Sequence, residues 1–292
     1  MNNWKLFCFG FGYGAEALAR RLPAGWRIAA TCREESKRAA LAERGIDAWL
    51  FDGEGPLADS ATALAGATHL LSSVPPGKAE DPVLARHGAD IARLSGLRWV
   101  GYLSTTGVYG DRDGGWVDES SELRPTGERG RRRVAAETAW LDLWRRHGLP
   151  VHVFRLAGIY GPGRSVFDNL RQGRAQRVDK PGQVFSRIHV DDIAAVLAAS
   201  MAKPNPGAIY NVCDDDPAPP AEVIVHAADL LGIEPPPLVP FAEAKLSDMA
   251  RSFYADNKRV RNDRIKAELG VELAYPDYRR GLADILKGEC GR

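Results

Sequence analysis

The chain has 292 residues, 45% of them hydrophobic and 26% charged, which is enough for one large α/β domain or two unequal ones. Lys and Arg number 39 against 38 Asp and Glu, so no global field favours nucleic acid or an anionic membrane. The four cysteines show no C-x-x-C spacing, which argues against a disulfide framework and a metal site. No stretch of about 18 apolar residues occurs. We therefore expect a soluble cytoplasmic protein that holds no metal and binds neither nucleic acid nor a membrane.

Short apolar runs alternate with segments of helical periodicity over the first 160 residues. Such alternation is typical of βαβ units, and it predicts a doubly wound parallel sheet of the Rossmann kind with helices on both faces. In chain order the expected strands cover 6–9, 27–31, 48–51, 68–72, 99–104 and 151–156, and the expected helices cover 15–22, 35–44, 57–64, 82–94 and 130–147.

The order becomes less regular after the Gly161-Pro162-Gly163 turn. A strand at 188–190, a helix at 192–201 and a strand at 208–212 still fit the Rossmann pattern, whereas the last sixty residues mix helix and loop. We therefore predict a dinucleotide-binding domain made of 1–160 and 184–214. A smaller mixed region, made of 161–183 and 215–292, is expected on the substrate side.

A glycine-rich motif of the form G-x-G-x-x-A lies between the first strand and the first helix. Gly10 permits the tight turn, Gly12 lets the backbone approach a pyrophosphate, and Ala15 lets helix and strand pack closely. The N-terminus of the helix then faces the phosphates. The motif predicts a dinucleotide site formed by Gly10, Phe11, Gly12, Tyr13, Gly14 and Ala15.

The end of the second strand indicates which dinucleotide is bound. Arg33 offers a guanidinium suited to a 2′-phosphate, with Lys37 and Arg38 one turn further on, and this favours NADP. NAD stays an alternative because Glu34 is adjacent, and the basic residues also suit a solvated helix start. Asp52 suits either an adenine contact or a turn. After the fourth strand, Ser72, Ser73 and Val74 are expected to line the cofactor or to form a rigid turn.

Four ordered segments resemble the extended short-chain dehydrogenase/reductase family, the NAD-dependent epimerase/dehydratase group. They are Ser104-Thr105-Thr106-Gly107-Val108-Tyr109-Gly110, the run 155–163, Arg187-Ile188-His189-Val190-Asp191-Asp192, and Tyr210-Asn211-Val212. The resemblance covers residues 10 to about 216 and implies NAD(P)-dependent chemistry on a small or nucleotide-linked substrate. It also implies a Ser or Thr that orients the substrate oxygen, a Tyr that exchanges a proton, and a Lys that lowers the pKa of this Tyr.

The chain departs from this pattern where the family places Y-x-x-x-K. Arg129 occupies the Tyr position and Arg133 the Lys position, and no tyrosine occurs between Tyr109 and Tyr160. A guanidinium stays protonated at physiological pH, so Arg129 cannot replace the phenol as an acid, although Arg133 is suited to a ribose or phosphate of the cofactor. The sequence therefore resembles the atypical members of the family.

The remaining candidates have two or more interpretations. The basic run 129–133 is either a solvated helix start, although the helix dipole opposes positive charge there, or a site for an anionic ligand; nucleic acid is disfavoured.

Tyr109 is either a substitute acid or a wall of the cleft. Asp191 or Asp192 is expected to cap a helix. The predicted catalytic residues are Ser104, Thr105 and Tyr109, and the predicted substrate-binding residues are Thr106, Arg129 and Arg187.

The sequence leads to two main functional hypotheses. The first is an NADP-binding, epimerase/dehydratase-like oxidoreductase of the atypical short-chain class that acts on a small or nucleotide-linked polar substrate, with an anionic ligand as an alternative. The second is a non-catalytic NADP-binding sensor or interaction protein, suggested by the loss of the Tyr and Lys; a typical sugar-nucleotide epimerase is disfavoured by the same loss. A homodimer is expected through the helix that carries Trp140, Leu141, Leu143 and Trp144, although these residues also suit the core.

Overall fold

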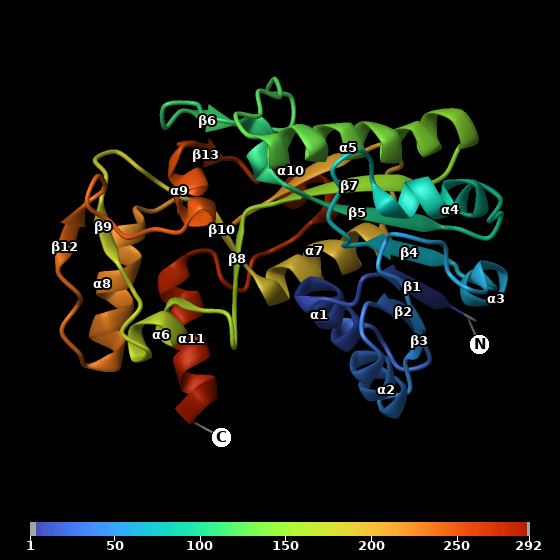
Figure 1. The fold of residues 1–292 in the computed structure, drawn as a ribbon, viewed down its shortest axis with the longest axis horizontal. Helices are drawn as coiled ribbons and strands as arrows, with labels where there is room; N and C mark the ends of the chain where they lie inside the picture. Colours follow the sequence, from blue (N-terminus) through green and yellow to red (C-terminus); the bar gives the residue numbers. More distant parts are fainter. Residues whose placement is uncertain (1–3, 291–292) are drawn as a thin grey trace.

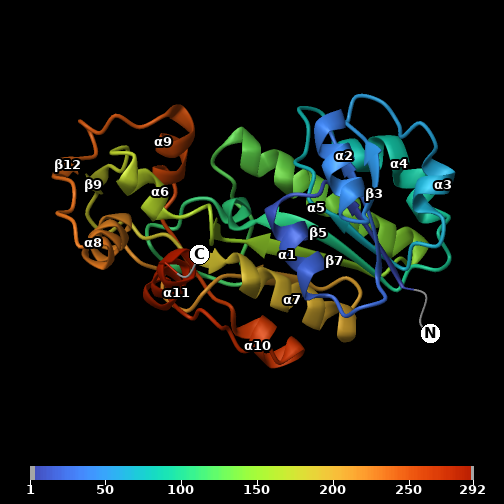
Figure 2. The same ribbon diagram turned by 90° about the horizontal axis from the view of Figure 1, so that it is seen from below.

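A seven-stranded parallel sheet forms the centre of the computed structural model, which describes residues 4–290 (Figures 1 and 2). The strand order is β11-β7-β5-β4-β1-β2-β3, and each neighbouring pair is parallel. This order reverses between β1 and β4, which is the switch point of a doubly wound sheet. The strands are β1 (Lys5–Phe9), β2 (Arg27–Cys32), β3 (Asp47–Leu50), β4 (His69–Ser72), β5 (Trp99–Thr105), β7 (Val151–Leu156) and β11 (Ile209–Val212).

Alternate residues of the buried strands pack into two separate cores, one on each face of the sheet. In β1, Leu6 and Cys8 belong to one core and Phe7 and Phe9 to the other. Strands buried on both faces read as continuous apolar runs, which is why the sequence predicts them well. The first core is covered by α1 (Tyr13–Arg21), α2 (Glu35–Glu43), α7 (Val190–Ala202) and α10 (Asp263–Leu269), and the second by α3 (Ser60–Leu64), α4 (Pro82–Ala92) and α5 (Glu128–His147).

The fold class predicted from the sequence is confirmed, and the predicted elements of the sheet lie within a few residues of the observed ones. The strand predicted at 188–190 is observed, but it belongs to one of three two-stranded parallel sheets that the sequence did not reveal. They pair β6 (Trp116–Val117) with β13 (Arg259–Val260), β8 (Gly158–Tyr160) with β10 (Arg187–His189), and β9 (Arg177–Asp179) with β12 (Leu238–Pro240). Strands of two or three residues are too short to show a period of their own.

A smaller part of the molecule lies beyond the carboxyl ends of the sheet strands, on the left in Figure 1. Its helices are α6 (Val166–Arg171), α8 (Pro220–Leu231), α9 (Asp248–Tyr254) and α11 (Tyr278–Cys290). The predicted division at residues 161, 184 and 215 stays a prediction. However, Ile265 and Leu269 of α10 pack into the first core of the sheet, so the C-terminal segment also contributes to the larger part.

The start of α7 differs from the expected one. His189, rather than Asp191 or Asp192, is the N-cap, and its side chain accepts a hydrogen bond from the Asp191 amide at 3.2 Å. The buried Asp192 carboxylate instead accepts from the amides of Ala274 and Tyr275 at 2.8 and 3.0 Å. The carboxylate that the sequence predicts as a cap therefore attaches the distant segment before α11 to α7.

The helix expected to mediate dimerisation directs most of its large apolar side chains inward. Trp140, Leu141 and Leu143 of α5 are buried in the second core, and Trp144 lies against Gly207. Three of the four residues are thus already packed within one chain, whereas Trp144 is 37% exposed, and the homodimer stays a prediction.

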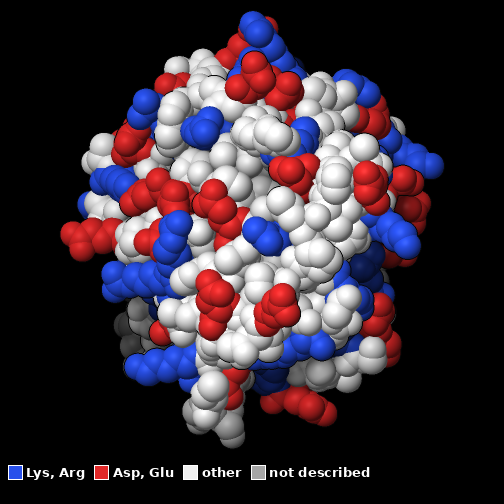
Figure 3. Space-filling view, turned by 90° about the vertical axis from the view of Figure 1, so that its left-hand side faces the viewer, with Lys and Arg blue, Asp and Glu red and all other residues white. Residues whose placement is uncertain are grey.

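Charges of both signs are mixed on the face of the smaller part (Figure 3). Within residues 4–290, no helix is both long and apolar enough to span a bilayer. Figure 3 shows the face of the smaller part, where acidic and basic side chains are interspersed over the whole view. A polyanion is attracted by a continuous basic surface, which this face does not present.

Stability is expected to fall as the pH drops from about 6.5 to 4, because His152 in β7 is buried in a neutral form. Its Nε2 accepts from the Asn205 amide at 2.9 Å, and burial lowers the pKa of the ring from 6.5 to about 4. Between these two values the unfolded chain binds a proton that the folded chain rejects, so acid favours unfolding. Urea unfolding at pH 7, 6 and 5 measures this slope. The variant His152→Gln should show a shallower slope, and an unchanged slope would contradict the assignment.

Candidate functional site

The glycine turn after β1 is fixed to the two neighbouring strands. Gly10 has a φ of +79°, and its amide donates to Thr31 Oγ1 of β2 at 2.8 Å. Its carbonyl accepts from Ser73 Oγ, which follows β4, also at 2.8 Å. A Cβ at this position would lie 2.9 Å from Ser73 Oγ, so both the left-handed backbone and the close approach require glycine. The turn therefore lies at the switch point of the sheet, where open α/β sheets bind ligands.

The start of α1 leaves space and free amides for an anion. Gly12 is the N-cap with no side-chain hydrogen bond, and a Cβ there would meet no atom within 4 Å. Gly14 and Ala15 are buried; a Cβ at Gly14 would lie 3.8 Å from Leu103 and 3.9 Å from Ile193. The helix thus packs closely on β5 and α7 while its positive end stays open.

Two side chains of the motif point away from this opening. Phe11 is buried in the first core, and its amide donates to the Thr31 carbonyl at 3.1 Å. Tyr13 donates its hydroxyl to the Pro162 carbonyl at 3.0 Å, and burial raises the pKa of this phenol to about 12. Only the backbone of these two residues faces the site.

The end of β2 carries one cation without an acidic partner. Arg33 is exposed and makes no ion pair within residues 4–290, whereas Arg38 pairs with Glu35. Lys37 Nζ donates to the Phe11 carbonyl at 2.7 Å and so braces the glycine turn. Asp52 accepts from the Glu54 amide at 2.9 Å, which is the geometry of a turn residue.

The segment after β4 completes the opening. Ser72 is fully buried, and its hydroxyl is among the buried polar atoms that lack a partner. Ser73 holds the Gly10 carbonyl, as described above, and the Val74 side chain lies 3.4 Å from the place of a Cβ on Gly10. The donors, the uncapped helix and the open space at Gly12 fit the pyrophosphate of a dinucleotide.

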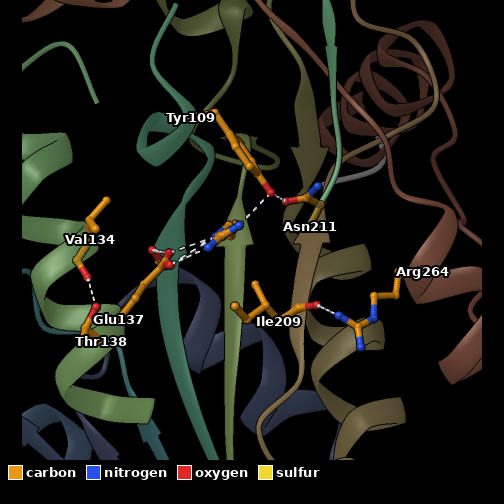
Figure 4. A network of polar contacts seen from close by, with 9 residues as sticks. Tyr109, Val134, Glu137, Thr138, Ile209, Asn211 and Arg264 are labelled. Carbon is orange, nitrogen blue, oxygen red and sulfur yellow. Dashed lines mark hydrogen bonds and ion pairs between the residues drawn. The ribbon is translucent and has the colours of Figure 1, made fainter. Parts of the chain in front are cut away.

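A buried polar network lies beneath the end of β5 (Figure 4). Glu137 of α5 and Arg155 of β7 form an ion pair with a 2.8 Å contact, and each side chain is only 3% exposed. Ser104 Oγ donates to Glu137 Oε1 at 2.5 Å. Ser104 is therefore directed into the protein and holds the strand end in place.

Tyr109 belongs to the same network. Its hydroxyl donates to Asn211 Oδ1 at 2.7 Å and accepts from Arg155 at 2.9 Å. Burial raises the pKa of this phenol to about 12 although the Arg155 guanidinium opposes the shift. Tyr109 thus stays protonated at neutral pH with its hydroxyl fully engaged. The catalytic roles predicted for Ser104, Thr105 and Tyr109 stay predictions.

Thr105 and Thr106 follow the carboxyl end of β5, and both are half-buried at the start of the 3-10 turn η1 (Thr106–Tyr109). Thr105 Oγ1 accepts from the Gly107 amide at 3.2 Å. Arg133, in the family's Lys position, donates to the Leu103 carbonyl at 2.7 Å and to the Tyr102 hydroxyl at 3.2 Å. Its guanidinium therefore stabilises the carboxyl end of β5, next to Thr105.

The four arginines at the start of α5 have different environments. Arg131 and Arg132 both pair with Glu128, at 3.1 and 3.0 Å. Arg133 is directed to β5, as described above. Arg129 is exposed, has no acidic partner within residues 4–290, and lies 5.8 Å from the centroid of the Phe253 ring in α9. The basic run is thus a solvated helix start at two positions only.

Arg187 lies apart from these residues, in β10. Its guanidinium donates to the carbonyls of Phe185 and Ala218 at 2.7 and 3.1 Å, and it lies 6.0 Å from the centroid of the Tyr278 ring. The nearby Asp214 is 1% exposed with neither carboxylate oxygen partnered, so burial raises the pKa of its carboxyl well above 3.8. A cavity of about 580 Å³ lies between β9, α8 and the start of α11, and Tyr278 and Arg279 line it.

Neither the Glu137–Arg155 pair nor the Arg129–Phe253 contact is predicted from the sequence. Glu137 lies eight residues after Arg129 on the same helix. An acidic residue in this helix and a basic residue in the strand that follows it are the signal that could have suggested the Glu137–Arg155 pair. Phe253 lies 124 residues away from Arg129 in the least regular part of the chain, where no period points to it. No group of three or more His, Cys, Asp or Glu that could hold a metal ion occurs within residues 4–290.

Known proteins resemble this chain over nearly its whole length. Protein YeeZ of Escherichia coli K12 is 30% identical over 287 residues, covering 94% of this chain and 97% of YeeZ. The structure of a functionally unknown conserved protein from Silicibacter pomeroyi DSS is 56% identical with a TM-score of 0.89, covering 98% and 99% of the two chains.

Sugar-nucleotide enzymes share the fold. The structure of UDP-glucuronic acid 4-epimerase from Bacillus cereus, in complex with NAD, has a TM-score of 0.77 at 14% identity and covers 98% of this chain and 99% of its own. The sequence model of the NAD dependent epimerase/dehydratase family matches residues 83–213, which include the network beneath β5 and the start of α5. Together with the glycine turn at the switch point, these likenesses show that the chain belongs to the NAD-dependent epimerase/dehydratase family.

Proposed function

We propose that the chain is an NADP-dependent oxidoreductase that acts on a small anionic substrate. The observation that carries this proposal is the opening at the switch point, which has an uncapped α1, open space at Gly12 and the unpaired Arg33 at the end of β2. When bound, the cofactor would supply or accept a hydride. Arg33 would hold the 2′-phosphate, and the backbone of the glycine turn would hold the pyrophosphate.

The residues at the end of β5 would position the substrate. We propose that Thr105 and Thr106 orient its reacting oxygen, while Ser104 and Tyr109 keep this strand end in place through Glu137 and Arg155. Arg133 would hold a cofactor oxygen and Arg129 an anionic group of the substrate. Because both cations stay protonated, they stabilise negative charge and do not transfer protons.

A non-catalytic NADP sensor is the second candidate, and one observation favours it. The position of the family's proton-exchanging Tyr holds Arg129, and the hydroxyl of the nearby Tyr109 is buried between Arg155 and Asn211. No phenol is therefore free for proton exchange at this point of the structure. Stereospecific hydride exchange with a carbonyl substrate supports the enzyme, and cofactor binding without turnover across a broad substrate panel supports the sensor.

Replacing Arg33 with alanine is expected to weaken NADP binding by about 10- to 100-fold and to leave NAD binding unchanged. A charge-assisted hydrogen bond to a phosphate contributes about 1.5–3 kcal/mol, and NAD lacks this phosphate. Calorimetric titration with NADP, NADPH, NAD and NADH measures the change. Arg44→Ala is the matched control, because Arg44 is exposed at the other end of α2 and pairs with Glu16 at 2.8 Å.

The titrations also decide between the cofactors. Equal affinities for NADP and NAD in the unaltered protein would contradict the NADP assignment. No binding of any of the four dinucleotides would overturn both functional candidates.

A further inference from the structure

The start of α5 and helix α9 form one side of the substrate end of the site. Both ribbon views place α9 beside the N-terminal end of α5 (Figures 1 and 2). Thr126, just before α5, donates its hydroxyl to Asp256 Oδ1 at 2.6 Å, and the Asn257 amide donates to Asp111 Oδ1 at 2.8 Å. These contacts connect the two segments next to Arg129.

Helix α9 presents two large apolar side chains at this place. Met249 and Phe253 are 60% and 55% exposed, and as positions i and i+4 they share one face of the helix. Exposed apolar side chains next to one another, bordered by a charged group, are typical of a ligand surface rather than of a solvated face. The charged group here is Arg129, whose guanidinium lies over the Phe253 ring.

Arg129 is placed to reach a bound substrate. A Cβ on the next residue, Gly130, would lie 3.1 Å from the Gly107 carbonyl in η1, so the first turn of α5 rests against the segment that begins with Thr105 and Thr106. Arg131 and Arg132 share one carboxylate, that of Glu128, whereas Arg129 has no acidic partner among residues 4–290. The positive charge at this point is therefore available to an external anion.

We infer that Arg129, Phe253 and Met249 form a recognition site for a planar, conjugated carboxylic acid. The carboxylate would pair with the Arg129 guanidinium, whose planar fork matches it, and the flat part would lie against Phe253 and Met249. This inference rests on the proposed function, because it names the substrate class for the same site. It assigns to Arg129 the binding of charge in the place where the family has a proton-exchanging Tyr.

Binding of cinnamate to the full chain in the presence of saturating NADP tests the inference. We expect Arg129→Ala to weaken cinnamate binding by at least about tenfold, the loss of one charge-assisted contact, and Phe253→Ala to weaken it by about three- to tenfold. Arg131→Ala is the matched control, since this arginine is equally exposed on the same turn but is paired, and it should leave cinnamate binding unchanged.

Two further probes separate charge from shape. Cinnamyl alcohol has the flat group without the carboxylate, and cyclohexanepropionate has the carboxylate without the flat group; both are expected to bind at least tenfold more weakly than cinnamate. Cinnamate binding that is unchanged in Arg129→Ala would overturn the inference, and so would equal binding of cyclohexanepropionate. The NADP titration of the same samples keeps the proposals distinct: NADP binding without cinnamate binding overturns only this inference, whereas cinnamate binding without NADP binding overturns only the proposed function.

Discussion

Replacing Glu137 with alanine is expected to lower the free energy of unfolding by about 3–5 kcal/mol, because the change leaves the buried Arg155 guanidinium without its counter-ion. Three hydrogen bonds from Arg155 and one from Ser104 end on this carboxylate. Urea unfolding at pH 7 measures the loss. An unchanged slope of the unfolding free energy against urea concentration would show that the variant exposes the same surface on unfolding.

Two variants separate the effect of charge from that of packing. Glu137→Met combined with Arg155→Met removes both charges and keeps apolar volume, so the double variant should be closer to the unaltered protein than Glu137→Ala is. Glu128→Ala removes an exposed acid from the same helix, and because exposed pairs are screened by water we expect no measurable change. A loss below about 1 kcal/mol for Glu137→Ala would contradict the assigned role.

The sequence predicts the sheet well because its central strands β1, β4, β5 and β7 are buried on both faces. Their apolar runs are bounded by glycines and polar turns, and helices of regular period follow. The same reasoning fails for the short strands β6, β8, β9, β12 and β13, which are defined by their partners rather than by their own residues. The predicted cap of α7 was wrong for another reason. The Asp192 carboxylate accepts hydrogen bonds from the amides of Ala274 and Tyr275, so it does not cap the helix.

The backbone part of the candidate site could be predicted, whereas the directions of its side chains could not. A glycine motif between a strand and a helix fixes the place of Gly10 and Gly12 in any doubly wound sheet. The direction of Ser104 depends on Glu137, and that of Tyr109 depends on Arg155 and Asn211. These partners are 33, 46 and 102 residues away in sequence, beyond the reach of a local pattern.

The basic run at the start of α5 shows why composition alone left its role open. Positive charge in a first helical turn is unfavourable, and Glu128 relieves it for two of the arginines by pairing with residues three and four positions on. Arg133 is held by acceptors of β5. Arg129 and Arg133 both lack an acidic partner within residues 4–290, but only Arg129 also has no hydrogen-bond acceptor there, so the anion-binding alternative applies first to Arg129.

Replacing Gly12 with valine is expected to weaken NADP binding by at least about 100-fold, which corresponds to about 2.7 kcal/mol, while the chain stays folded. A Cβ here would meet no atom beyond its chain neighbours within 4 Å, and the φ of −97° suits valine. The added methyl groups would instead occupy the space through which the backbone approaches a pyrophosphate. Calorimetric titration with NADP measures the loss of affinity.

Gly127→Val is the matched control for this experiment. Gly127 is also an N-cap without a side-chain hydrogen bond, has a φ of −108°, and has no atom within 4 Å of a Cβ. Both substitutions therefore carry the same cost for the helix cap, about 1 kcal/mol or less, and similar melting temperatures are expected. Because only Gly12 lies at the switch point of the sheet, only its variant should lose NADP. Undiminished NADP binding by Gly12→Val would show that the dinucleotide, if bound, does not use this turn, and equal losses in both variants would point to a general effect of the valine on folding.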